Sequence, residues 1–411
     1  MRRRSAIGGE VWPGALATFF ATALASPASA QSACATCSDT GLAPCSGCAA
    51  GAAGSLQFCS ECARCRACGG SFVVACTCPA KDAAAGELTR RRAAVEAWGR
   101  EIATPVEAAG ARTLPTCRTR HFDLRFAPAG IDGCPAKDVH AQMHLYATRL
   151  EGLRAQAGAV LGVDADAGKE VDEAGDKGVG RGDDATARAA VALVRDELEA
   201  ARWTAHVAGL EPQGLGAVRE RAAVLRHDPR ATDDDAALQR LLAHAVAHLT
   251  LDGVFAAATD PAPSTDVPPA WLAEGFAHWL EATQPGGLCE TCCVLERLQP
   301  PRRFLGGAWR RGARDLLARG QLPSVADLLP RDVADFTPAH HVLAFVLVDL
   351  LTRPTQAPST PGPAADSRGL PRAVQALRAG RSSAVALAAA GLDPASVDDR
   401  VVAFVRETYP P

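Results

Sequence analysis

Two histidines four residues apart, His244 and His248, lie in the stretch "LLAHAVAHLTLDG" at residues 241–253. The Ala- and Leu-rich composition of this stretch is typical of a helix. On a helix, residues i and i+4 lie on the same face with their Cβ atoms about 5–6 Å apart, so both rings could bind one metal ion. A zinc site needs at least one further protein ligand, which another element must supply.

The predicted third ligand is Glu274, in the stretch "PAWLAEGFAHWLE". The aromatic and aliphatic residues around it are typical of a buried helix face, where an unpaired carboxylate is costly. A metal ion on the two histidines would be its partner. His278, one turn further on, is expected to orient a ligand from behind, the alternatives being a fourth ligand or a surface residue. Glu281 is expected to be exposed. His340 and His341 are either substrate-facing or structural.

A second group of metal-ligating residues lies near the N-terminus, where ten of the fifteen cysteines occur. Most form C-x-x-C pairs, each of which supplies two thiolates toward a tetrahedral zinc site. The segment resembles the cysteine-rich zinc domain of DnaJ-type chaperones, although its spacing is irregular and its last pair is C-x-C. Outside the cytoplasm the same thiols could oxidise to disulfides, so zinc and disulfides both remain open. The ten residues are Cys34, Cys37, Cys45, Cys48, Cys59, Cys62, Cys65, Cys68, Cys76 and Cys78.

The first thirty residues have the layout of a secretory signal peptide. Three arginines precede an apolar run at residues 11–24, which ends at the small residues 28–30. We therefore expect export to the periplasm, the cell envelope or the medium, with no stable membrane span after cleavage. The alternative is an uncleaved membrane anchor.

The elements that must position these residues follow from hydrophobic periodicity. Strands before helices predict an α+β fold with a mostly helical C-terminal part. The chain of 411 residues is long enough for one large domain and a small module, and its net charge of −3 gives no reason to expect nucleic-acid binding. We predict strands at 120–128, 188–194 and 221–228, and helices at 80–110, 137–161, 195–209, 233–251 and 270–283.

The pairing of H-x-x-x-H with a following W-L-x-E-G-F-A resembles the gluzincin metallopeptidases, and more narrowly the peptidase MA-like group. The resemblance extends over about residues 120–409 and implies a zincin-like fold, with zinc bound by His244, His248 and Glu274. In the motif H-E-x-x-H both histidines bind zinc and the glutamate is the general base. Ala245 stands at that position here. The resemblance therefore implies a site without its catalytic base.

The absence of a general-base glutamate at position 245 determines which function we expect. Zinc alone lowers the pKa of bound water toward about 7, but general acid–base catalysis contributes about 10²–10⁴-fold to a reaction rate. We expect an exported pseudopeptidase that retains the metal ligands and binds a protein or peptide. The alternatives are an active zinc peptidase with a displaced carboxylate, such as Glu281 or Asp252, and a purely structural secreted protein in which neither site holds metal.

These features divide the chain into four parts. A signal peptide occupies residues 1–30, a cysteine-rich, zinc-ribbon-like module residues 31–79, and a helical linker residues 80–116. The peptidase MA-like domain follows at 117–411. Its acidic, Gly-rich segment at 162–187 lacks periodicity and is predicted to be a flexible insertion.

Overall fold

The computed structural model describes most of the chain beyond residue 33. The predicted signal peptide lies outside the described residues, as do residues 164–187 of the predicted acidic insertion. The described residues are 34–38, 40–46, 48, 56–108, 114–127, 131–163, 188–195, 197–203, 216–219, 221–227, 234–256, 267–289, 307–353 and 369–410.

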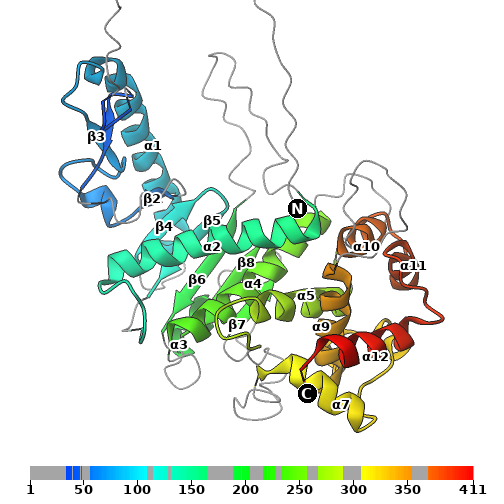
Figure 1. Cartoon of the computed structure of the whole chain (residues 1–411). Helices are drawn as coiled ribbons and strands as arrows, with labels where there is room; N and C mark the ends of the chain where they lie inside the picture. Colours follow the sequence, from blue (N-terminus) through cyan, green and yellow to red (C-terminus); the bar gives the residue numbers. More distant parts are fainter. Residues whose placement is uncertain are drawn as a thin grey trace, which may run out of the picture.

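A six-stranded sheet lies at the centre of the chain (Figure 1). Its order is β2 (Leu56–Cys59), β4 (Thr116–Thr119), β5 (Phe122–Phe126), β6 (Ala189–Val194), β8 (Ala222–Arg226) and β7 (Gly216–Arg219). The three central strands β5, β6 and β8 pair in parallel, and the outer strands pair antiparallel. Because β2 comes from the cysteine-rich region, backbone hydrogen bonds join that region to the main sheet.

Both faces of the sheet are covered, which explains why β6 is apolar at consecutive positions. Val191 and Leu193 of β6 belong to the main core, formed with α2 (Val139–Leu161) and α4 (Asp235–Ala256). The alternate residues Ala192 and Val194 pack on the opposite face with Trp203 of α3 (Glu197–Trp203). The sheet therefore holds α2 and α4 side by side on one face.

The remaining described elements are mostly helical, and Figure 1 places the cysteine-rich region and the C-terminal helices at opposite ends of the molecule. None of the helices described is long and apolar enough to cross a bilayer. Within the cysteine-rich region, β1 (Leu42–Pro44) pairs with β3 (Val73–Ala75), and the 3-10 turn η2 (Cys62–Arg64) contacts β2. The other elements are α1 (Lys81–Ala108), α5 (Ala270–Ala282), α7 (Trp309–Ala318), α8 (Val325–Leu328), the 3-10 turn η6 (Val333–Asp335), α9 (Pro338–Thr352), α10 (Gly369–Arg378), α11 (Ser383–Ala389) and α12 (Val397–Thr408).

The mixed helix and strand content predicted from periodicity is confirmed, as are the individual strands and helices that were predicted. Within the predicted helix at 195–209, the described helical residues are 197–203. The sequence pattern did not predict strands β1, β2, β3, β4 and β7. The pairings of β1 with β3 and of β2 with β4 join segments far apart in the chain, whereas β7 pairs with the neighbouring strand β8.

Candidate metal centre

Helix α4 carries the two histidines of the H-x-x-x-H stretch. The side chain of Asp234 accepts a hydrogen bond from the backbone N–H of Ala237, which satisfies a free donor at the start of the helix. Asp235 then fixes α4 to α2, because its carboxylate binds the guanidinium of Arg149 at 2.6 and 2.7 Å. His244 and His248 lie on consecutive turns further along α4.

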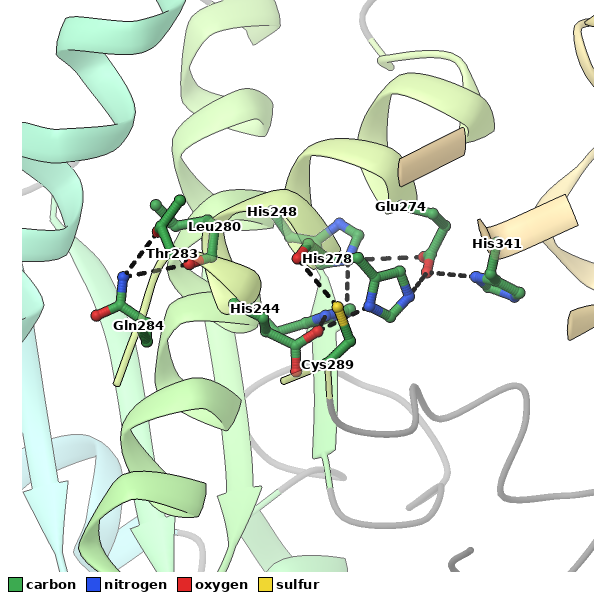
Figure 2. Close-up of polar contacts among 10 residues, drawn as sticks. His244, His248, Glu274, His278, Leu280, Thr283, Gln284, Cys289 and His341 are labelled. Carbon is green, nitrogen blue, oxygen red and sulfur yellow. Dashed lines mark hydrogen bonds and ion pairs between the residues drawn. The ribbon is translucent and has the colours of Figure 1, made fainter. Parts of the chain in front are cut away.

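Helix α5 lies against α4 and carries the third predicted ligand (Figure 2). Nε2 of His244 lies 3.1 Å from Nε2 of His248, and the latter lies 3.6 Å from Oε1 of Glu274. Ligands about 2.0–2.1 Å from a tetrahedral zinc ion are about 3.3 Å apart. The three side chains therefore have the spacing of a metal site, and together they could hold one ion.

The environment favours the protonation states that metal ligands need. Burial lowers the pKa of His244 and of His248, which keeps both imidazoles neutral. Burial opposes ionisation of Glu274, but the imidazoles of His341, His248 and His244 outweigh it and hold the pKa of this carboxyl well below its usual range. Two neutral imidazoles and one carboxylate can bind a cation without first losing protons.

Glu281 lies behind this triad and is buried, so the expectation that it is exposed is wrong: the side chain is 1% exposed. Seven residues are almost two full helical turns, which places Glu281 on the same face of α5 as Glu274. Its Oε2 lies 2.7 Å from Nδ1 of His278 and 3.3 Å from Nδ1 of His244. Burial lowers the pKa of His278 to about 4, although Glu281 opposes this shift.

The position of Glu281 separates two possible roles. His244, His278 and Glu281 could also hold an ion. However, 2.7 Å between Glu281 and His278 is a hydrogen-bond length and is shorter than the spacing of two ligands on one ion. Glu281 therefore binds the Nδ1 side of His244, while Nε2 of that ring faces His248 and Glu274. A carboxylate in this position fixes the orientation of a ligating histidine.

The two consecutive histidines of α9 have different roles. His341 is fully buried, and its Nδ1 lies 3.3 Å from Oε2 of Glu274. His340 instead caps the helix that carries it: its Nδ1 accepts a hydrogen bond from the backbone N–H of Thr337, and its Nε2 lies 2.8 Å from Asp327. His341 thus belongs to the candidate centre, and His340 stabilises the start of α9.

Ala245, at the position of the missing base, is 1% exposed. It lies on α4 directly after His244. Its methyl group can neither accept nor deliver a proton. The described centre therefore has three side chains that could together hold a metal ion and no acid–base side chain at position 245.

The cysteine-rich region contains two sets of four thiols that could each hold an ion. The Sγ–Sγ distances within the sets are 3.8 Å for Cys34–Cys76 and 3.4 Å for Cys37–Cys78, then 3.8 Å for Cys45–Cys65 and 3.6 Å for Cys48–Cys68. Thiolates about 2.3 Å from a tetrahedral zinc ion are about 3.8 Å apart. All cysteines that the structure describes are free thiols, and the spacing within these two sets is that of metal ligands.

Cys59 and Cys62 lie apart from both sets and face His140 and His144 of α2. Sequence reasoning did not single out these two histidines. A signal was present, because "HAQMH" repeats the four-residue spacing of His244 and His248. The spacing alone did not indicate that Cys59 and Cys62 lie beside these two histidines.

Comparison with known proteins gives no assignment: no family model, curated protein or solved structure matches the chain. Function must therefore be inferred from the residues and the geometry.

Proposed function

We propose that this chain is an exported zinc-binding pseudopeptidase, related to the gluzincin peptidases and binding a polypeptide without cleaving it. The observation that carries the proposal is the convergence of His244, His248 and Glu274 beside a buried Ala245. When bound, a zinc ion would act as a Lewis acid on a ligand carbonyl or water. The export and the polypeptide partner rest on the sequence pattern and the family resemblance.

The chemistry of the surrounding side chains favours binding over hydrolysis. Glu281, the nearest displaced carboxylate, contacts the Nδ1 side of His244 and hydrogen-bonds His278. Glu281 therefore lies on the opposite side of the His244 ring from Nε2, the nitrogen that faces the other ligands. A base that activates a metal-bound water would have to lie on the Nε2 side. The position of Glu281 suits orientation of His244. Asp252 lies one turn beyond His248 on α4 and is the remaining carboxylate to test.

The decisive experiment restores the base. Ala245→Glu should gain cleavage of unfolded casein that a chelator abolishes and added zinc restores. Ala245→Gln is the matched control, because it has nearly the same size and buries a polar group without an ionisable carboxyl. Circular dichroism and a metal count by mass spectrometry confirm that both variants are folded and loaded.

Each alternative outcome has a distinct meaning. If the unmodified chain cleaves casein as fast as Ala245→Glu, it is an active peptidase, and Asp252→Asn then tests the displaced base. If the chain retains no ion at His244 and His248, the proposal fails, and if the cysteine-rich region retains none either, the structural alternative holds. If Ala245→Glu is folded and loaded but inert, the centre is not a peptidase site.

A further inference from the structure

Four side chains from distant parts of the chain meet where the cysteine-rich region contacts α2. Cys59 is the last residue of β2, and Cys62 is the first residue of η2. His140 and His144 lie on the first two turns of α2, whose start is fixed by a hydrogen bond from the N–H of Ala141 to Asp138 at 2.8 Å. The two histidines therefore lie on one face of the helix, directed at the cysteine pair.

Their ligand atoms have the spacing of a tetrahedral metal site. Nε2 of His140 lies 3.4 Å from Sγ of Cys59 and 3.1 Å from Sγ of Cys62, and Nε2 of His144 lies 3.7 Å from Sγ of Cys62. A sulfur and a nitrogen ligand on one zinc ion are about 3.6 Å apart. We propose that these four residues form a Cys2His2 zinc site that fastens the cysteine-rich region to α2.

Hydrogen bonding alone does not explain this arrangement. A ring nitrogen makes one hydrogen bond, as donor or as acceptor, but Nε2 of His140 is within reach of two sulfur atoms. Cys59, Cys62 and His144 are also almost completely buried, where unshared polar contacts are costly. One cation at the centre of the four atoms satisfies all of them.

The remaining cysteines of the region fall into other groups that could each hold an ion of their own. The other eight of the ten form the two all-cysteine sets. Cys59 and Cys62 are thus completed by histidines more than seventy residues away along the chain. The proposed ion therefore acts between two parts of the fold, unlike the two all-cysteine sites, which act within the cysteine-rich region.

Such an ion would add a side-chain connection to the backbone pairing of β2 with β4. Structural zinc contributes directly to folding because the unfolded chain has no preformed site. Loss of the ion should loosen β2 and η2 from α2 while the two all-cysteine sites keep their ions.

Metal counting on the full chain by native mass spectrometry tests the site. The paired substitutions Cys59→Ser with Cys62→Ser should remove one zinc ion, and His140→Gln with His144→Gln should also remove one. The variant with all four changes should again lack only one ion, because both pairs belong to one site. His121→Gln is the matched control: this histidine binds Glu151 of α2 at 2.7 Å and contacts no cysteine among the described residues, so the count should not change.

Two results would overturn the proposal. One is an unchanged metal count in the paired histidine variant, and the other is a loss of two ions in the fourfold variant. Should a variant fail to fold, diethyl pyrocarbonate modification of the unaltered protein decides the question. His140 should be protected when zinc is bound and modified after chelation, and equal modification in both states would refute its role as a ligand.

Discussion

Gly275 lies at the closest approach of α5 and α9, and replacing it with alanine tests whether this packing is as tight as described. A Cβ atom at position 275 would overlap the carbonyl oxygen of Ala344. It would also lie 2.7 Å from the carbonyl carbon of that residue and 2.9 Å from Cγ2 of Val348. Carbon atoms in favourable contact are about 3.5–4.0 Å apart. Since the obstacle is mainly backbone, the two helices would have to separate.

The expected cost follows from two opposing effects. Overpacking of a core costs about 1–3 kcal/mol, and backbone overlap belongs at the upper end of that range. Alanine in a helix interior recovers about 1 kcal/mol relative to glycine. Gly275→Ala should therefore lower the free energy of unfolding by about 2 kcal/mol, and it should move His341 away from Glu274.

Urea denaturation followed by circular dichroism measures this change, with zinc held in excess. Gly152→Ala is the matched control, because Gly152 is also helical and a Cβ there has no neighbour within 4 Å among the described atoms. The control should be more stable than the unmodified protein by about 0.5–1 kcal/mol. If Gly275→Ala matches or exceeds the stability of the unmodified protein, α5 and α9 are not packed as closely as the structure indicates.

Two further predictions concern the side chains that support the centre. Glu281→Gln should weaken zinc binding at His244 and His248 by about 10–100-fold, because it alters the group that orients His244. In a competition with a chelator, Glu274→Gln should weaken zinc binding more than Glu281→Gln does, because Glu274 is the proposed ligand. Equal effects of the two substitutions would contradict the roles of ligand and orienting group. Asp235→Asn should cost about 1–3 kcal/mol at neutral pH, because it leaves the partly buried Arg149 without its carboxylate. Arg149 and Tyr146 outweigh burial and hold the pKa of Asp235 below 3.8. Its contribution is therefore complete above that value and is lost as the pH falls through the folded-state pKa, so unfolding curves of the two proteins should converge in acid.

The positions of helices α1 to α5 and of strands β5, β6 and β8 could be predicted because they depend on residues close together in the chain. The alternation around Phe122 to Phe126 and the helical period over Val139 to Leu161 are local patterns. The pairing of β2 with β4 could not be predicted, because a strand four residues long becomes stable only against a partner that the local pattern does not identify. Strand β7 pairs with the neighbouring strand β8, but its four residues Gly216–Arg219 are too few for a clear alternation of apolar and polar side chains.

The sequence by itself indicated that His244 and His248 share a helix face, and that Glu274, a carboxylate within an apolar helix, could complete their site. Tertiary structure alone decided which groups surround them: a buried Glu281 behind His244, and His341 of α9 beside Glu274. It also decided that Cys59 and Cys62 meet a helix more than seventy residues away. Spacing along a helix fixes the neighbours within one or two turns. Contacts between elements depend on how the whole sheet and its covering helices pack.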